Sequence, residues 1–376
     1  MNNSMRPSLP PALFLTLLSA CGPSGGGDQS QGPVPVPAPE APPAAASAEP
    51  AAIDLHGAGA TFPYPLYSKW VDEYQKANPN VRINYQSIGS GGGIRQISER
   101  TVDFGASDAP MNEEELAKAP GKLVHVPMTL GAVVVSYNLP EAPALTLSAE
   151  LIAGIFLGDV KTWNDPRIAK LNPGAKLPKE AIGVAYRSDG SGTTAVFTDY
   201  LAKVSPAWKE KVGAGKSVKF PTGMGAKGNE GVAGQIKTTP GTVGYVELAY
   251  AKQTGLSVAS LQNSAGKVVE ASLDSISAAA AGVAATIPDD LRVSITNAPG
   301  DAAYPISAFT YILVYEEAAD ATKGKALAKF LWWAVHEGQA LGAPLHYAPL
   351  PPEVVTKVEA KLKALKAGGQ VALASL

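Results

Sequence analysis

Short apolar runs alternate with amphipathic segments along most of the chain. Apolar residues recur every four positions in the segment 65–77, at Leu66, Trp70 and Tyr74, which predicts an amphipathic helix. Runs rich in β-branched and aromatic residues predict strands at 81–88, 102–107, 131–138, 181–186, 242–248 and 309–315. This alternation predicts a protein built of α/β layers.

Two further helices have clear local signals. Asn112 and Glu115 have the spacing of a capping box, which predicts a helix start in the segment 112–119. Near the C-terminus, the segment 351–367 carries apolar residues on one helical face, at Val354, Val358, Leu362 and Leu365. The pattern contains no internal repeat.

The N-terminus follows a different pattern. A short start with Arg6 leads into an apolar stretch that is too short to span a bilayer and ends in LSAC at 18–21. This order of regions predicts a signal peptide over residues 1–20. The LSAC sequence resembles the lipobox of bacterial lipoproteins, which implies cleavage before Cys21 and acylation of its thiol. The alternative is an ordinary secretory signal with an incidental cysteine, and both interpretations export the protein.

Residues 22–50 contain almost no side chain that could fill a hydrophobic core. A Gly/Ser-rich part gives way to a Pro/Ala-rich part, which is the composition of a flexible and then semi-extended tether. At about 3.1 Å per residue in its polyproline-like part, this tether could reach tens of ångströms. We therefore expect residues 21–50 to hold the lipid-modified Cys21 and the tether. Folding should begin near Ala51, and the rest of the 376-residue chain is longer than a single core usually holds.

Composition narrows the class of protein. The chain is 45% apolar and 17% charged, which suits a soluble globular protein with a large core. Its formal net charge is −2 and it has no run of Lys or Arg, so we expect no nucleic-acid partner. The four histidines are far apart and lack metal-ligand spacing, so we interpret them as structural and expect no metal or other cofactor. They are His56, His125, His336 and His346.

One glycine pattern resembles a nucleotide-binding motif. The segment 223–228 matches GxGxxG, and Glu247 follows about where a ribose-binding acid would lie. However, the strand candidate before the pattern is short and is broken by Pro221, and the helical stretch after it is also short. We interpret this segment as a loop.

Three predicted helix starts combine glycines with hydroxyl residues. A helix N-terminus has unpaired N–H groups and about half a positive charge, so each start could hold an anion. Ser, Thr, Asp and Gly are also common N-caps, so capping alone could explain any one of them. Three together favour an anion site with donors from several directions. The segments are 57–63 with Thr61, 89–93 with Ser90, and 189–193 with Ser191 and Thr193.

Arg187 fits the same anion site. Its guanidinium group offers a planar fork to two oxygens of an oxyanion, and Asp189 could fix its orientation. The alternative is a local salt bridge on a turn, which contributes about 0–1 kcal/mol when exposed.

Asp108 is the unexpected member of the group. It precedes a helix that Asn112 already caps, and a carboxylate beside an anion is unfavourable unless the ligand carries a proton. Hydrogen phosphate can donate that proton to Asp108. Fully ionised sulfate cannot, and two facing acceptors about 3 Å apart would repel by roughly 5 kcal/mol. We therefore expect Asp108 to act as a specificity filter.

Five sequence blocks have a specific order and spacing: GAGATFPYPLYSKW, IGSGGG, VDFGASDAPM, RSDGSGTTAVFTDYLAKV and KGNEGVAGQI. Together they closely resemble the phosphate-binding proteins of bacterial high-affinity phosphate ABC transporters, from about Leu55 to about Val355. The resemblance implies a class II periplasmic-binding-protein fold, in which two α/β lobes are joined by two crossing hinge segments. It places lobe I at 51–128 plus 306–376 and lobe II at 129–305.

The resemblance also implies roles for single residues. Asp108 would accept the phosphate proton, Phe62 would donate its backbone N–H, and Asp189 would hold the arginine. Gly91 stands where the family often has a second serine, so this chain lacks that minor donor. The implied phosphate contacts are Thr61, Phe62, Ser90, Asp108, Arg187, Ser191, Gly192 and Thr193.

The function that the resemblance implies is capture of inorganic phosphate for the permease subunits of a phosphate ABC transporter. The protein would not be an enzyme, and it would work in the periplasm or at the cell surface, anchored to a lipid bilayer through acylated Cys21. Three alternatives remain at this point. They are a binding protein for another tetrahedral oxyanion such as sulfate or molybdate, a phosphate-ester hydrolase with Ser191 or Thr193 as nucleophile, and a lipoprotein for adhesion or sensing.

Overall fold

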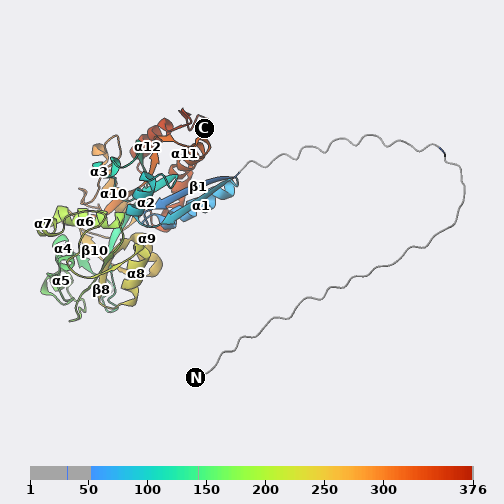
Figure 1. The fold of residues 1–376 in the computed structure, drawn as a ribbon. Helices are drawn as coiled ribbons and strands as arrows, with labels where there is room; N and C mark the ends of the chain where they lie inside the picture. The colour runs from blue at the N-terminus through green and yellow to red at the C-terminus, as the bar shows by residue number, and fades with distance from the viewer. Residues whose placement is uncertain (1–31, 33–51, 143, 375–376) are drawn as a thin grey trace, which may run out of the picture. The chain divides into compact units, whose positions relative to one another are not determined.

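The structure is a computed structural model that describes residues 32, 52–142 and 144–374 (Figure 1). The predicted signal peptide, Cys21 and nearly all of the predicted tether lie outside the described residues. The folded part forms one compact unit, Pro50–Leu376. Among the helices of the described ranges, none combines the length and the apolar character needed to cross a membrane.

The main sheet consists of two groups of parallel strands on either side of a central antiparallel pair. The outer groups are β2, β1 and β3 at one end and β8, β6 and β7 at the other. In sheet order the strands are β2 (Val81–Ser87), β1 (Ile53–Gly59), β3 (Phe104–Ser107), β12 (Ser307–Tyr315), β4 (Leu123–Tyr137), β8 (Thr242–Glu247), β6 (Gly183–Arg187) and β7 (Met224–Ala226), and β9 (Ser257–Val258) also pairs with β4.

Two strands, β4 and β12, connect the two groups. The part of β4 that ends at Ala132 pairs with β12, whereas the part from Val133 to Tyr137 pairs with β8. We call the part of the protein around β1, β2 and β3 the first lobe, and the part around β6, β7 and β8 the second lobe. The predicted fold, two α/β lobes joined by two crossing segments, is confirmed. The predicted residue boundaries of the lobes remain a prediction.

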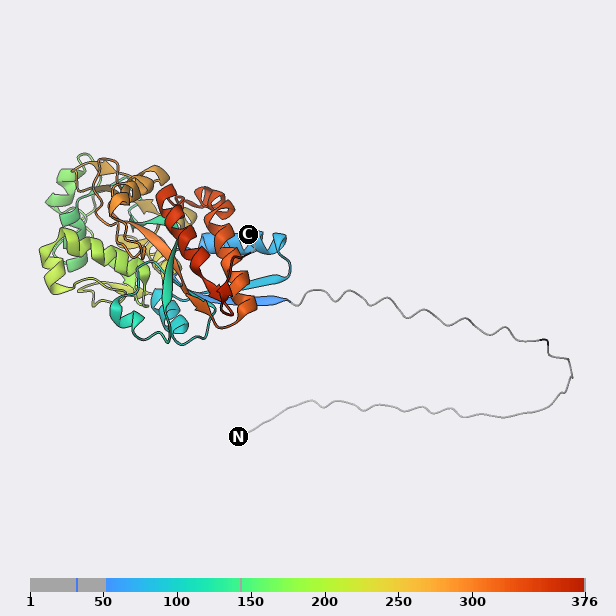
Figure 2. The same ribbon diagram turned by 90° about the horizontal axis from the view of Figure 1, so that it is seen from above.

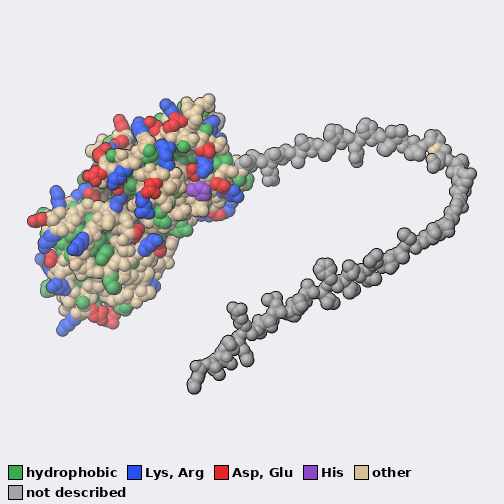
Figure 3. All heavy atoms as spheres, in the orientation of Figure 1, with side chains coloured by type: hydrophobic (Ala, Val, Ile, Leu, Met, Phe, Trp, Pro, Cys, Tyr) green, Lys and Arg blue, Asp and Glu red, His purple; other side chains and the backbone are tan. Residues whose placement is uncertain are grey.

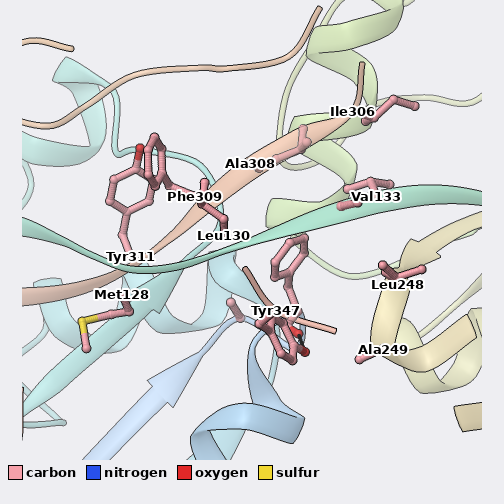
Figure 4. Packing of buried hydrophobic residues seen from close by; sticks show 14 of the residues in the cluster. Met128, Leu130, Val133, Leu248, Ala249, Ile306, Ala308, Phe309, Tyr311 and Tyr347 are labelled. Atoms are coloured by element: carbon pink, nitrogen blue, oxygen red, sulfur yellow. Dashed lines mark hydrogen bonds between the residues drawn. The ribbon is translucent and has the colours of Figure 1, made fainter. Parts of the chain in front are cut away.

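Apolar packing around the crossing strands joins the lobes into one core. Figure 4 shows Met128, Leu130 and Val133 of β4 close to Ala308 and Phe309 of β12. These side chains are at most 5% exposed, so both strands are buried along the crossing. Bending between the lobes must therefore preserve this apolar contact, because exposing it to water is unfavourable.

Helices cover the strands of each lobe. In the first lobe, α1 and α2 pack on β2, β1 and β3, and the chain returns from the second lobe to place α11 against β1. Figure 2 shows these C-terminal helices, in red and orange, beside the blue N-terminal strands. The helices of the first lobe are α1 (Tyr64–Ala77), α2 (Ser90–Ser98), α3 (Glu113–Leu116), α11 (Ala321–Val335) and α12 (Pro352–Ala364), with the 3₁₀ turns η2 (Glu337–Leu341) and η3 (Ala343–Leu345).

The second lobe has more helices, and α6, α8 and α9 contact its strands or β4. Its helices and turn are α4 (Ala149–Leu157), α5 (Pro166–Leu171), α6 (Gly192–Val204), α7 (Pro206–Lys211), α8 (Gly228–Thr238), α9 (Leu248–Thr254), α10 (Leu273–Ala281) and η1 (Ala284–Thr286). Two small sheets complete the fold: β5 (Thr146–Leu147), β10 (Ser260–Gln262) and β11 (Val268–Val269), and β13 (Glu317–Ala318), β14 (Lys366–Ala367) and β15 (Gln370–Val371).

Most of the predicted elements are present. Each predicted strand overlaps an observed one, although β4 begins eight residues before the predicted start at 131. The capping box of Asn112 and Glu115 is formed, but the helix that it opens, α3, has only four residues. The strand β1 was not predicted because its sequence, IDLHGAG, lacks a run of β-branched residues.

The interpretation of the GxGxxG segment as a loop is wrong. Met224–Ala226 form the edge strand β7, parallel to β6, and Gly228 opens the eleven-residue helix α8. Gly223 has φ of 102°, and an added Cβ would collide with the backbone of Val184. The glycine therefore lets a very short strand pack tightly against its neighbour. The interrupted sequence pattern gave no sign of this strand.

Candidate functional site

The candidate site lies where two sets of strands end. Because β1, β2 and β3 are parallel, their carboxyl ends lie at one edge of the sheet, where ligands of α/β proteins usually bind. The chain segments that leave this edge carry Thr61, Ser90 and Asp108. All three residues are at most 3% exposed. The first lobe therefore gathers two hydroxyl groups and one carboxyl group at a single buried edge.

The second lobe presents a matching edge. Arg187 is the last residue of β6, and Ser191 is the N-cap of α6, where its hydroxyl accepts a hydrogen bond of 3.0 Å from Thr194 N–H. Gly192 and Thr193 form the first turn of α6. The unpaired N–H groups of that turn can donate hydrogen bonds to an anion.

The two edges touch each other. The N–H of Gly91 in the first lobe donates to the carbonyl of Gly190 in the second lobe at 2.8 Å. A Cβ added to Gly192 would overlap both Ser90 Oγ and Asp108 Oδ2. The absence of a side chain at Gly192 therefore lets the first turn of α6 approach Asp108 directly. The structure brings all the predicted contact residues into one buried cluster between the lobes.

Arg187 forms the predicted ion pair with Asp189. Its Nε and Nη2 atoms lie 2.8 and 2.5 Å from the two carboxylate oxygens, and the guanidinium side chain is only 1% exposed. Gly228 N–H also donates to Asp189, at 3.0 Å. Burial alone would raise the pKa of Asp189, but the hydrogen bonds and charge of Arg187 outweigh it, so the pKa is lowered. The pair is thus a fixed internal unit and not an exposed bridge on a turn.

Asp108 has an unusual environment for a carboxyl group. Its Oδ1 accepts a hydrogen bond of 2.9 Å from Thr310 of β12, and its Oδ2 is 3.5 Å from Ser90 Oγ. Burial raises the pKa of Asp108 to about 7, although the bond from Thr310 and the charge of Arg187 act in the opposite direction. Near neutral pH this group can therefore act as an acceptor when ionised and as a donor when protonated.

Several residues of the site were not predicted. Asn229, at the start of α8, donates to Thr61 Oγ1 at 2.7 Å and to Thr193 Oγ1 at 3.1 Å. Tyr250 donates to the carbonyl of Thr61 and Tyr347 to that of Phe62, both at 2.6 Å. Only Asn229 had a sequence signal, because it lies in the conspicuous block KGNEGVAGQI.

The two tyrosine contacts explain how the first lobe presents Phe62. The carbonyl of Thr61 and the N–H of Phe62 belong to one peptide group. A hydrogen bond from Tyr250 to that carbonyl polarises the group and strengthens its N–H as a donor. Tyr250 lies on α9 and Thr61 follows β1, so this contact also joins the lobes.

Two of the four histidines make structural contacts through their rings. His125 Nε2 accepts from Met111 N–H at 3.0 Å, and burial lowers the pKa of His125 to about 4, which keeps the ring neutral. His336 contacts the carbonyl of Trp332 and the carboxylate of Glu359, neither of which belongs to the site. Across the part of the chain that the structure describes, no three His, Cys, Asp or Glu side chains are grouped so that they could hold a metal ion.

Charged groups on the surface are mixed in sign. On the face shown in Figure 3, Lys and Arg side chains alternate with Asp and Glu, and no large area carries one sign of charge. Many charged side chains of the described residues form local ion pairs, and Arg82 donates two hydrogen bonds to Asp54. This face therefore offers an anion no large positively charged area.

Comparisons with known proteins place the chain among relatives of one kind. A model of the PBP superfamily domain matches residues 44–337. The phosphate-binding protein PstS of Pasteurella multocida is 51% identical over 311 residues, which cover 82% of this chain and 90% of that protein. PstS of Xylella fastidiosa (strain 9a5c) is 48% identical over 310 residues, covering 82% and 84%. The solved phosphate-binding protein of Stenotrophomonas maltophilia shares the fold, with a TM-score of 0.65 at 23% identity, covering 85% of this chain and 97% of that chain.

Proposed function

The chain belongs to the PstS family of phosphate-binding proteins within the PBP superfamily, and we propose that it captures inorganic phosphate between its lobes and delivers it to an ABC transporter. It acts outside the cytoplasm as a solute-binding protein. The observation that carries this proposal is the buried cluster between the lobes, in which an arginine, hydroxyl groups and helix N-termini lie around the buried carboxyl group of Asp108.

Phosphate binds among donors from both lobes in this proposal. After its hydrogen bonds to Asp189 and Thr193, Arg187 has two of its five N–H groups left for the anion. The first turns of α2 and α6 add backbone N–H groups and partial positive charge. Asp189 supports Arg187. The contacts are Thr61, the N–H of Phe62, Ser90, Asp108, Arg187, Ser191, the N–H of Gly192, and Thr193.

Asp108 supplies the selectivity. Its ionised carboxylate accepts the proton of hydrogen phosphate, whereas sulfate has no proton to give at neutral pH. The hydroxyl of Thr310 holds the other carboxylate oxygen, so Asp108 cannot easily turn away from the ligand. The repulsion between two facing acceptors then opposes sulfate.

The lobes close on the ligand by a hinge motion of the crossing strands. We assign residues 51–128 plus 306–376 to lobe I and residues 129–305 to lobe II. Closure excludes water from the site and strengthens every hydrogen bond to the anion. Opening then releases phosphate to the permease.

The N-terminal residues attach the protein to a membrane in this proposal. Cleavage before Cys21 and acylation of its thiol would leave the Gly/Pro/Ala-rich tether between the bilayer and the folded part. Replacing Cys21 with Ser should move the protein from the membrane fraction to the soluble extracytoplasmic fraction. Unchanged fractionation would overturn the anchor and leave the phosphate proposal intact.

Calorimetric titration of the purified, phosphate-free protein tests the central proposal. We expect one phosphate to bind and a large excess of sulfate to leave that binding nearly unchanged. Strong displacement by sulfate would instead assign the site to another oxyanion.

Neither Ser191 nor Thr193 has a histidine partner among the described residues, so we expect no release of phosphate from a chromogenic ester. Release of phosphate above background would instead support a phosphate-ester hydrolase.

A further inference from the structure

Asn229 is a completely buried amide between the two lobes. It lies in the first turn of α8 in the second lobe, and its side chain reaches Thr61 of the first lobe and Thr193 of the second. None of the phosphate contacts assigned above involves this residue. Its position nevertheless places it in direct contact with two of them.

The orientation of the Asn229 amide is fixed by a backbone donor. Glu247 N–H donates to Asn229 Oδ1 at 2.9 Å, and an N–H group cannot accept. The oxygen of the amide must therefore face Glu247, so its NH₂ group must face the threonines. The distances from Nδ2 are 2.7 Å to Thr61 Oγ1 and 3.1 Å to Thr193 Oγ1.

This orientation determines the direction of the hydrogen bonds at both hydroxyl groups. Thr61 Oγ1 accepts from the side-chain and the backbone N–H groups of Asn229, the latter at 3.3 Å. Thr193 Oγ1 accepts from Asn229 and from Arg187 Nη1, at 3.2 Å. Both lone pairs of each oxygen are thus in use. Neither hydroxyl donates to another group within the described residues, so both protons are available to a ligand.

We propose that Asn229 is a positioning residue that holds the hydroxyl groups of Thr61 and Thr193 as donors toward the phosphate oxygens. This inference rests on the proposed function. An isolated hydroxyl can rotate and act as donor or acceptor, whereas one whose lone pairs are occupied can only donate. Because the two hydroxyls come from different lobes, one amide orients donors on both sides of the closed site.

The test uses calorimetry with inorganic phosphate and a double-mutant cycle. Asn229→Ala should weaken phosphate binding about 10- to 100-fold, because both hydroxyls lose their fixed orientation. In a Thr61→Val background the same substitution should weaken binding by a clearly smaller factor, because one of its two targets is gone. An equal loss in both backgrounds would overturn the proposal, since it would show that Asn229 does not act through Thr61.

A conservative variant separates polarity from packing. Asn229→Asp keeps the shape and the acceptor for Glu247 N–H, but its carboxylate would accept from both threonines and draw their protons from the ligand. We expect it to bind phosphate more weakly than Asn229→Ala does. If Asn229→Asp bound phosphate as tightly as the native protein does, the result would contradict the proposal. If the alanine variant fails to fold, the aspartate variant still tests the proposal.

A matched control measures the cost of losing a buried amide elsewhere. Asn263 is 7% exposed and donates to backbone carbonyls of residues 300, 301 and 303, away from the site. Asn263→Ala should lower the unfolding temperature without weakening phosphate binding. If the native protein binds no phosphate, the proposed function fails. If it binds but the cycle shows no coupling, only the role of Asn229 fails.

Discussion

The carboxyl group of Asp108 can act as an acceptor or as a donor near neutral pH. Burial raises its pKa to about 7, and the hydroxyl of Thr310 and the nearby charge of Arg187 only partly offset that shift. The ionised form suits a ligand that brings a proton, and the protonated form suits a fully ionised ligand. On the proposed function, Asp108 therefore sets the selectivity between phosphate and sulfate, and we expect that selectivity to depend on pH.

Replacing Asp108 with Asn should raise sulfate affinity relative to phosphate. The amide can donate to a sulfate oxygen and removes the repulsion between two acceptors. At pH 8 we expect the preference for phosphate over sulfate to fall by at least about 100-fold, corresponding to roughly 3 kcal/mol. Competition calorimetry measures this ratio. An unchanged ratio would show that Asp108 is not the filter.

The same residue should make the stability of the phosphate-free protein depend on pH. In the unfolded chain Asp108 has its ordinary pKa of 3.8, and in the folded protein the pKa is about 7. Between these values the folded state retains a proton that the unfolded state releases. The contribution of Asp108 to the free energy of unfolding therefore decreases as the pH rises from about 4 to about 7, and it is lost above that.

Thermal unfolding of the native protein and of Asp108→Asn, in buffers without phosphate, measures this contribution. The native protein should lose stability relative to the variant as the pH rises from 5 to 8. Groups that do not interact with Asp108 are common to both proteins and cancel in the difference, whereas the charge of Asp108 contributes to the raised pKa of the buried Glu247, so the difference reports the two carboxyl groups together. A difference that does not change with pH would contradict the raised pKa.

At the scale of single elements, the sequence predicts those parts of the site that depend on local chemistry. Ser191 caps α6, and Arg187 pairs with Asp189 two residues away. Short-range sequence patterns were therefore sufficient to predict both contacts. Thr310 and Tyr250 reach the site from β12 and α9, which lie far away along the chain. No local pattern marks them, because their positions depend on how the two lobes meet.

One contact between elements should slow phosphate release. Lys216 of the second lobe donates to Glu115 of α3 at 2.8 Å and to the carbonyl of Pro110 at 3.1 Å, both in the first lobe. The carbonyl of Lys216 accepts from Ser191 N–H, so this contact links α3 to the start of α6. The charged side chains are only 15% and 22% exposed, so screening by solvent is limited. The pair forms only when the lobes are close together.

Lys216→Met should therefore speed phosphate release about two- to fivefold, with little effect on the association rate. Stopped-flow dissociation into excess unlabelled phosphate, at pH 8, measures the rate. Lys209→Met, on the exposed side of α7, is the matched control because it removes the same charge at a distance. Equal release rates in all three proteins would show that the ion pair does not hold the lobes together.

At the scale of the whole molecule, the apolar pattern predicted the alternation of strands and helices, and the family resemblance implied the two crossings. The sequence did not predict β1, whose glycines weaken its strand pattern, or the register in which β4 passes from β12 to β8. That register depends on long-range pairing. It determines which residues of one lobe face the other, and closure depends on it.

Gly192→Ala tests closure of the whole molecule. The added Cβ would overlap Ser90 Oγ and Asp108 Oδ2 of the first lobe, while alanine favours α6 itself. The lobes should then fold normally but fail to close, so phosphate affinity should fall about 100-fold or more. Small-angle scattering should show no compaction with phosphate, unlike in the native protein. Gly234→Ala, in α8 with no heavy atom within 4 Å of the added Cβ, should bind and close normally. Native-like compaction of Gly192→Ala would mean that closure does not need this close approach.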